Sequence, residues 1–387
     1  MIPIKYNVQS LMVRRTTSLM TAAGVALVVM ILVLLLNVVG GLRRSLELAG
    51  DPNVWILLSR GTSSEVESFI PRDEFDVLRT RPEIATTASG DALISPEMVL
   101  PFNAAIKRPA NQFHPAFLRG VQPAAYLVHP GVRLIKGRWP APGCEEMVIG
   151  RKLQARFPEL EVGSTFRYGR RNWTLVGVIA DHGSVRESEF WADIDVLEQD
   201  ARFENGFSSF HAVLKPGMEE TFKRALTEDA RLTVDAITER DYYAAQTAVA
   251  DQLRSLVLLV GLIIGIGAAF GGMNTMYAAV ARRSREVGVL RSLGFCSRSV
   301  LASFLLESEL IALGGGILGI AGALLVSSLI GLNRRLLSVG AVTFSSHFGL
   351  SACASGLVAA VLIGAAGGLL PAWRASRMTV TDALHEA

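Results

Sequence analysis

Four long stretches without a charged side chain constrain this chain more than any other feature of its sequence. Residues 16–42, 255–281, 310–333 and 336–373 contain no Asp, Glu, Lys or Arg. Each stretch exceeds the ~20 residues that a helix needs to cross ~30 Å of hydrocarbon. The sequence therefore predicts a membrane protein with four transmembrane helices, at 16–42, 255–281, 299–333 and 350–373.

The first stretch is expected to stay in the protein. Its uncharged run is longer than the ~7–15 apolar residues of a secretory signal. It leads through Gly40 and Gly41 into Arg43 and Arg44 without a small-x-small cleavage pattern. We therefore expect a transmembrane helix and not a cleaved signal peptide.

Basic residues are distributed unevenly around the predicted spans. With four spans, both termini and the 282–298 connection share one side of the membrane. That side carries ten basic residues, namely Lys5, Arg14, Arg15, Arg282, Arg283, Arg285, Arg291, Arg298, Arg374 and Arg377, against Glu286, Asp382 and Glu386. Because such loops face the cytoplasm, we expect both termini, the 282–298 segment and the 374–387 tail to be cytoplasmic, with a short extracytoplasmic loop at 334–349.

A mild excess of arginine on the other side does not change this prediction. The residues concerned are Arg43, Arg44, Arg334 and Arg335. A basic membrane border explains the arginines better than nucleic-acid binding does, so no nucleic-acid partner is expected.

The first 15 residues have an amphipathic pattern. Ile4, Val8 and Leu11 share one helical face, while Lys5 and Arg15 lie largely elsewhere. The pattern predicts an interfacial helix on the inner leaflet. A basic N-terminus that only enforces orientation is the alternative.

Residues 43–254 read as a folded extracytoplasmic domain between the first two spans. Residues 166–168 and 172–180 flank Gly169 and favour a β-hairpin, and 134–139, 146–150 and 161–166 add strands and tight turns. Residues 71–79 and 218–226 read as helices. We expect a mixed α+β domain with two subdomains, and a helical stalk at 238–254 that continues the second span.

The cytoplasmic connection at 282–298 contains a small amphipathic helix. From Glu286 to Gly294 it reads E-V-G-V-L-R-S-L-G. Val287, Leu290 and Leu293 recur at helical spacing, and a glycine suits the position that follows a helix end. The pattern predicts a docking surface for a cytoplasmic partner.

This segment closely resembles the R-E-x-G-x-x-[RK]-x-x-G motif of the MacB/FtsX family of ABC-transporter permeases. The series L-x-x-G-R-W, E-M-V-I-G-x-x-L, V-G-x-x-F and W-T-L-V-G-V in residues 134–178 resembles the MacB-like periplasmic core domain. The chain also ends like the family, with Thr381-Asp382-Ala383-Leu384. The resemblance covers nearly the whole chain, and the stretch 103–130 departs from the family pattern.

The resemblance implies that the connection contacts a separate ATPase subunit. The implied contact residues are Glu286, Val287, Gly288, Leu290, Arg291, Leu293 and Gly294. On this reading the three large apolar side chains enter a groove of the ATPase and Gly288 allows close backbone approach. Glu286 and Arg291 would fix the register by polar contacts.

Two glutamates lie where the third span begins, and charged groups there need a partner or access to the membrane interface. Glu307 matches the family's F-L-x-E position, which implies that it anchors the third helix against the connection, paired with a base such as Arg298. A residue that snorkels to the headgroups is the alternative. The role of Glu309 is left open.

Small residues recur at four-residue spacing in the spans, as at Gly315, Gly319 and Ala323, at Gly261, Gly265 and Ala269, and at Gly364 and Gly368. Such faces permit close helix packing. The pattern is compatible with a helix–helix contact at these residues, and it is equally compatible with the absence of one.

No catalytic, cofactor or metal site is expected from the sequence. The chain has no G-x-x-x-x-G-K-[ST] loop, G-x-S-x-G elbow or H-E-x-x-H helix. His114, His129, His182 and His211 lack ligand-like spacing, which favours surface or packing roles. Cys144, Cys296 and Cys353 fall in three different compartments, so no disulfide framework is expected.

The expected protein is thus a non-catalytic permease subunit of a bacterial ABC system in the inner membrane. ATP would be bound by partner ATPase subunits, and the permease would form a homodimer or a related heterodimer. The expected activity is export or extraction of a lipidic, peptide or drug-like substrate, with a periplasmic adaptor as a possible partner. The alternative is an FtsX-like signalling subunit that activates a periplasmic cell-wall hydrolase.

Overall fold

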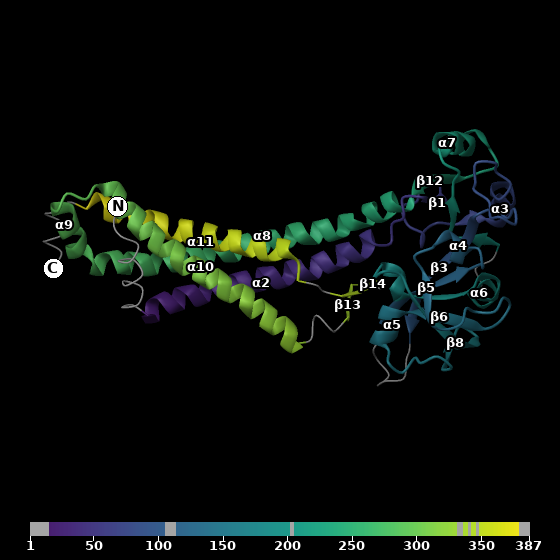
Figure 1. Ribbon diagram of the computed structural model, residues 1–387, viewed down its shortest axis with the longest axis horizontal. Helices are drawn as coiled ribbons and strands as arrows, with labels where there is room; N and C mark the ends of the chain where they lie inside the picture. The colour runs from purple at the N-terminus through teal and green to yellow at the C-terminus, as the bar shows by residue number, and fades with distance from the viewer. Residues whose placement is uncertain are drawn as a thin grey trace. The chain divides into compact units, whose positions relative to one another are not determined.

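The computed structural model describes residues 15–104, 114–201, 205–330, 336–339, 342–345 and 348–378. The predicted interfacial helix, apart from Arg15, and the closing motif at 381–384 lie outside the described residues. The chain divides into two compact units (Figure 1). The helical unit comprises Met1–Gly40, Asp251–Asn333 and His347–Ala387, and the sheet domain comprises Gly41–Ala250 and Arg334–Ser346.

Four helices of the described residues are long and apolar enough to cross a membrane. They are α2 (Arg15–Glu47), α8 (Glu239–Arg282), α10 (Ser297–Ile330) and α11 (Leu350–Arg377). They confirm the four predicted transmembrane helices. Because α8 is unbroken from Glu239, the predicted helical continuation of the second span through 238–254 is also confirmed.

Small residues let these helices approach one another closely. A Cβ on Gly315 or on Gly319 of α10 would lie only 2.6 Å from a backbone carbonyl oxygen of α2, that of Ala22 or Ala26. Ala323, one turn further along, is fully buried. The small face of the third span is therefore an interhelical contact within the chain.

The fourth span differs from the prediction at its C-terminal end. It was expected to end at residue 373, but α11 contains Pro371 and continues to Arg377. A proline inside a helix removes one backbone hydrogen bond, and its ring collides with the carbonyl four residues earlier. The helix nevertheless continues past Pro371, and Ala372 and Ala375 beyond it are buried against other helices.

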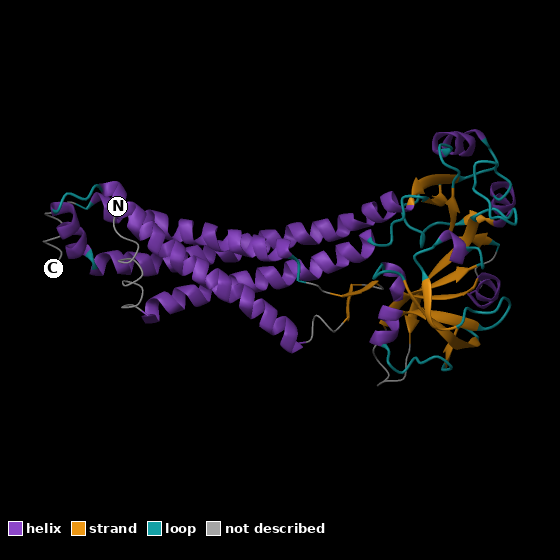
Figure 2. Cartoon of the chain, in the orientation of Figure 1, coloured by secondary structure: helices purple, strands orange, loops and turns teal. Residues whose placement is uncertain are grey.

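The sheet domain is built on one ten-stranded sheet (Figure 2). Its strands are β1 (Val54–Ser59), β3 (Ile94–Ala104), β4 (His114–Val121), β5 (Arg133–Gly137), β6 (Glu146–Gly150), β7 (Thr165–Tyr168), β8 (Arg171–Ala180), β9 (Glu189–Asp193), β11 (Ser209–Val213) and β12 (Val234–Thr238). The order is β12-β1-β11-β3-β4-β9-β6-β8-β5, with β7 paired to β8. Only the β4–β9 and β6–β8 pairs of this sheet are parallel. A continuous sheet thus replaces the two subdomains that the sequence suggested.

Short elements complete the sheet domain. They are the strand pairs β2 (Ile70–Pro71) with β10 (Gly206–Phe207) and β13 (Leu336–Val339) with β14 (Val342–Ser345), the helices α3 (Arg72–Leu78), α4 (Ala125–Val128), α5 (Arg151–Arg156), α6 (Ile194–Ala201) and α7 (Glu219–Glu228), and the 3-10 helix η1 (Val185–Ser188). Of these, α3 and α7 confirm the two predicted helices. The β7–β8 hairpin turns at Gly169, whose φ of +56° favours glycine, and confirms the predicted hairpin.

The two faces of the central strands differ in polarity. Met98 of β3 and Phe210 of β11 enter the main apolar core. Alternate residues point to the opposite face. Ser209 lies opposite Glu97 in the β11–β3 ladder, so Glu97, Ser209 and His211 share that second face. It is polar, and it is buried as well.

Candidate functional site

The predicted helix of the 282–298 connection is α9 (Ser284–Ser292), which lies between α8 and α10. Its end forms a Schellman motif, in which Phe295 N donates to Leu290 O at 3.2 Å and Gly294 N donates to Arg291 O at 3.1 Å. Gly294 has a φ of +92°. The predicted glycine position after the helix end is confirmed.

The inward face of α9 closes a core within the chain. Val287 is 2% exposed, and Gly288 is buried. Val287 belongs to a cluster that also contains Met276, Ala279, Val280, Val300, Phe304, Ala372 and Ala375 of α8, α10 and α11. Val287, which was predicted to enter a partner's groove, thus packs against helices of its own chain.

The outward face of α9 carries a different set of apolar side chains. Leu293 is 70% exposed, Val289 is 54% exposed, and Leu290 is half-buried. Val289 was not among the predicted contact residues. The helical spacing of the sequence could have included it, since Val289 and Leu293 are four residues apart.

The charged residues of α9 also make contacts inside the chain. Arg291 Nη1 donates to Ser376 O at 3.1 Å and to Met378 O at 2.8 Å. A guanidinium at these carbonyls stabilises the C-terminal end of α11. Arg291 is thus engaged by α11, and its predicted contact with a partner stays a prediction. Glu286 is exposed and accepts from Arg283 Nε at 2.9 Å.

Glu307 connects α10 to the start of α9. Its Oε2 lies 2.9 Å from Nη1 of Arg283, the residue that precedes α9, and the two side chains are 4% and 11% exposed. Burial excludes the snorkelling alternative for Glu307. The base is Arg283 and not Arg298, which is exposed. The guanidinium also stands over the ring of Phe304, 5.3 Å from its centroid.

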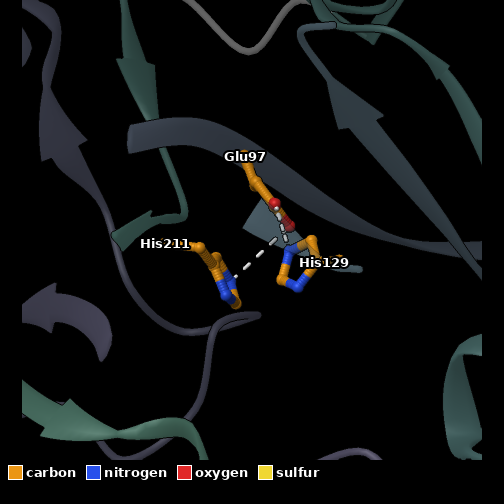
Figure 3. Close-up of side chains that lie close together, drawn as sticks. All are labelled: Glu97, His129 and His211. Carbon is orange, nitrogen blue, oxygen red and sulfur yellow. Dashed lines mark hydrogen bonds and ion pairs between the residues drawn. The ribbon is translucent and has the colours of Figure 1, made fainter. Parts of the chain in front are cut away.

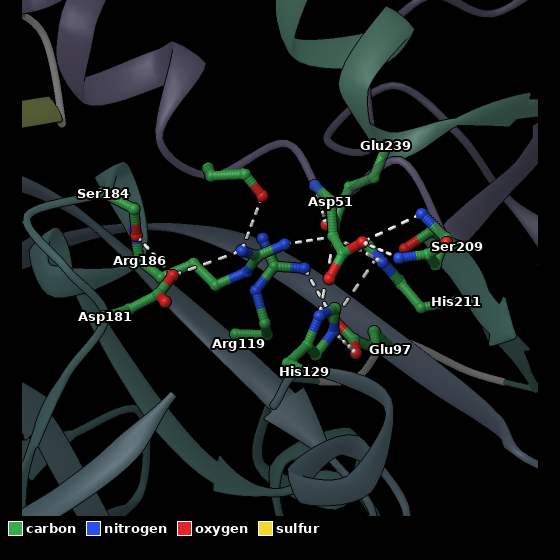
Figure 4. Close-up of polar contacts among 12 residues, drawn as sticks. Asp51, Glu97, Arg119, His129, Asp181, Ser184, Arg186, Ser209, His211 and Glu239 are labelled. Atoms are coloured by element: carbon green, nitrogen blue, oxygen red, sulfur yellow. Dashed lines mark hydrogen bonds and ion pairs between the residues drawn. The ribbon is translucent and has the colours of Figure 1, made fainter. Parts of the chain in front are cut away.

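The sheet domain contains a second candidate site, which we call the polar network (Figure 4). Its members are at most 5% exposed and comprise Glu65, Glu97, Arg119, His129, Asp181, Arg186, Glu189, His211 and Glu239. Arg119 lies at its centre, 2.7 to 2.8 Å from Glu65, Glu97 and Glu189. Buried charges of this kind require partners on every side.

Two of the four scattered histidines meet in this network. His129 Nε2 lies 2.8 Å from Glu97 Oε1, and His211 Nε2 lies 3.0 Å from Glu65 Oε1. Burial lowers the pKa of His129. Burial also opposes charge on His211, but the carboxylates of Glu97, Glu239 and Glu65 outweigh it and raise the pKa of His211 to about 9.

Sequence reasoning missed this cluster because its members are far apart along the chain. The signal available was the alternation in β3 and β11, where Ser95 and Glu97, and likewise Ser209 and His211, take alternate positions. Such positions are read as solvent-exposed in an antiparallel sheet. Here the first turn of α8, through Glu239, and the α4 segment, through His129, contribute partners that bury them.

Lys152 of α5 is another buried charge in this domain. Its Nζ donates to Ser45 Oγ at 3.0 Å and to Ser184 O at 3.2 Å, and also to Gly183 O. Burial lowers the pKa of Lys152 to about 8.

Two family models match the chain. The MacB-like periplasmic core domain matches residues 18–229, and the FtsX-like permease C-terminal matches residues 258–380. Between them they cover both units that the fold shows.

Curated relatives share part of their length with this chain. The macrolide export ATP-binding/permease protein MacB of Nitrobacter winogradskyi is 36% identical over 152 residues, which are 37% of this chain and 22% of that protein. MacB 1 of Yersinia pestis bv. Antiqua is 29% identical over 258 residues, which are 62% of this chain and 38% of that protein. The chain thus spans well under half of the length of both relatives.

Solved structures give more distant similarities. The periplasmic region of MacB from Actinobacillus actinomycetemcomitans aligns with a TM-score of 0.38 and 11% identity, over 51% of this chain and 94% of that one. The extracellular domain of the transporter YknZ from Gram-positive bacteria aligns with a TM-score of 0.36 and 13% identity, over 48% of this chain and 100% of that one.

Proposed function

This chain belongs to the MacB/FtsX-like family of ABC transporter permeases, and from that membership we propose that it is the membrane subunit of a bacterial ABC system. The protein lies in the inner membrane, with both termini and α9 in the cytoplasm. A partner ABC ATPase binds ATP and docks on α9. Its closure moves the membrane helices and the sheet domain, and thereby drives export or extraction of a lipidic, peptide or drug-like substrate.

The observation that carries this proposal is the division of α9 into two faces. Val287 is packed among α8, α10 and α11, while Val289 and Leu293 are more than half exposed. Exposed apolar side chains on a charged helix at the membrane border are suited to a protein partner, since interface centres are apolar and rims are polar.

The contacts that α9 makes inside the chain couple the docked ATPase to the membrane helices. Arg291 holds the C-terminal carbonyls of α11, and Arg283 holds Glu307 of α10. Packed cores transmit displacement because they are close-packed and deform little. A push on Leu293 by the ATPase therefore reaches three membrane helices at once. We assign Val287, Arg291 and Glu307 to this transmission, and we assign Val289, Leu290 and Leu293 to docking.

The test is a Leu293→Asp variant. Because Leu293 is 70% exposed, the carboxylate should change the stability of the permease by less than ~0.5 kcal/mol. At a docked interface the same carboxylate would be buried without a partner, and hot-spot losses of ~2 kcal/mol or more weaken binding at least ~30-fold. The tagged permease is purified from its native membranes in mild detergent, and the co-purifying ABC ATPase and its ATP turnover are measured.

The matched control is Leu127→Asp, the same substitution at a 60% exposed leucine of the sheet domain. Leu127→Asp should retain the ATPase at the parental level, and Leu293→Asp should lose it. Recovery of the parent without any ABC ATPase would remove the proposed function. Normal ATPase recovery and turnover in Leu293→Asp would leave the function standing and remove α9 as the docking site.

A further inference from the structure

The polar network contains side chains with the chemistry of a metal site. Glu97 of β3, His129 at the end of α4 and His211 of β11 each offer one ligand atom, and these atoms lie within 4.8 Å of one another (Figure 3). Imidazole nitrogens combined with a carboxylate are ligands that Zn²⁺ and related ions take. We propose that the sheet domain binds one divalent transition-metal ion of the zinc class through Glu97, His129 and His211.

The separations between the ligand atoms suit a single small ion. His129 Nε2 is 2.8 Å from Glu97 Oε1, and His211 Nε2 is 3.5 Å from Glu97 Oε2. Ligand atoms around a tetrahedral ion with bonds of ~2.0–2.1 Å stand roughly 3.3 Å apart. Small side-chain rotations bring the two nitrogens and one oxygen onto an ion. Arg119 Nη1 holds Glu97 Oε2 at 2.7 Å, which directs the ion to Oε1.

The Nδ1 atoms of both imidazole rings have surroundings typical of a metal-bound histidine. Nδ1 of His129 and Nδ1 of His211 are buried and have no hydrogen-bond partner among the described residues. Both face the same oxygen, Glu239 Oε1, at 3.5 and 3.4 Å. A histidine that ligates a metal through one nitrogen donates its other N–H to a carboxylate or carbonyl. An ion on the two Nε2 atoms would place a proton on each Nδ1, and both N–H groups would face Glu239 Oε1, which also accepts from Arg186 Nη2.

The charge of the network also favours a cation. Its carboxylates are Glu65, Glu97, Asp181, Glu189 and Glu239, and its guanidinium groups are those of Arg119 and Arg186. With neutral imidazoles, five negative and two positive charges leave the buried network at −3. A divalent ion brings it to −1, and so would a proton on each histidine. The experiment must therefore distinguish a metal ion from two protons.

The probe is Co²⁺ alone, added to the full-length purified chain after treatment with a chelator. We expect uptake of one Co²⁺ per chain, with the visible absorption of a four-coordinate or five-coordinate ion, and displacement of that ion by Zn²⁺. His129→Gln and His211→Gln should each weaken Co²⁺ binding at least ~100-fold, since each removes a ligand. Glu239→Gln should weaken it ~10-fold to 100-fold, as for other partners of metal-bound histidine.

The control variant is His182→Gln, because His182 is an exposed histidine of the same domain outside the network. It should bind Co²⁺ like the parent, and circular dichroism of every variant should match the parent. Uptake by the parent decides the proposal even where a variant fails to fold. A folded parent that takes up no stoichiometric Co²⁺ would show that protons balance the network, and an equal loss in His182→Gln would place the ion elsewhere. Either result overturns the proposed site.

Discussion

The buried pair between Arg283 and Glu307 should stabilise the protein far more than an exposed pair of similar length. Arg283 Nη1 lies 2.9 Å from Glu307 Oε2, with side chains 11% and 4% exposed. On α2, Arg43 Nε lies 2.7 Å from Glu47 Oε1, but these side chains are 42% and 50% exposed. The two pairs have the same chemistry and differ in access to water.

The expected magnitudes follow from that difference. Removing one partner of a buried pair costs ~3–5 kcal/mol. Glu307→Gln keeps an oxygen acceptor and Arg283 keeps Glu286, so we expect ~2–3 kcal/mol of lost stability. A double-mutant cycle of Arg283→Gln and Glu307→Gln should give a coupling energy of ~1.5–3 kcal/mol. The matching cycle of Arg43→Gln and Glu47→Gln should give less than ~1 kcal/mol.

The assay is equilibrium unfolding of the purified chain in mixed micelles, followed by circular dichroism as the SDS fraction is raised. Each cycle compares four proteins under one condition, so errors from extrapolation largely cancel. Coupling energies equal within ~0.5 kcal/mol for the two pairs would refute the reasoning, because burial would then not strengthen the Arg283–Glu307 contact.

Three further predictions concern packing, pH and topology. Gly319→Ala should destabilise the helical unit by ~1–3 kcal/mol in the same unfolding assay, because the added Cβ would lie 2.6 Å from Ala26 O. Gly271→Ala should cause no loss of stability, because a Cβ at Gly271 has no atom within 4 Å. Folding lowers the pKa of Lys152 from 10.5 to about 8, so between these pH values the unfolded chain binds the proton and the folded chain does not. The free energy of unfolding should therefore rise by up to about 3 kcal/mol from pH 8 to 10.5, relative to that of Lys152→Met. Parallel pH profiles of the two proteins would count against the shift. An impermeant thiol reagent added to spheroplasts should label Cys144 and spare Cys296, which are both exposed, and the reverse pattern would invert the proposed topology.

Features carried by contiguous residues were predictable from the sequence. An uncharged run of sufficient length forms a membrane helix whatever its neighbours are. Four such helices were expected, and four are found in the described part of the chain. The end of α9 was predictable for the same reason, because Gly294 alone supplies the positive φ that the Schellman motif requires.

Features that depend on distant segments were not predictable in this way. The apolar stripe of α9 predicts a buried face, but the sequence does not state whether Val287 meets its own chain or another. Nor does spacing reveal that His129 and His211 are neighbours, since the β3–β11 ladder and the α4 segment bring them together. The end of the fourth span was predicted at residue 373 and not at Arg377, because the sequence does not state that Ala372 and Ala375 pack against other helices.

The polar face of the central strands has a consequence for how the sheet reaches its correct pairing. Side chains alternate between faces, so a slip of one residue in a strand would move its whole set of side chains to the opposite face. In β4 such a slip would carry Arg119 into the apolar core beside Phe190, and would carry Leu118 among carboxylates. Misaligned pairings of these strands are thus destabilised, because a charged side chain would be buried among apolar residues without a partner. The buried charges therefore favour one strand register over the other registers that the apolar residues alone would tolerate.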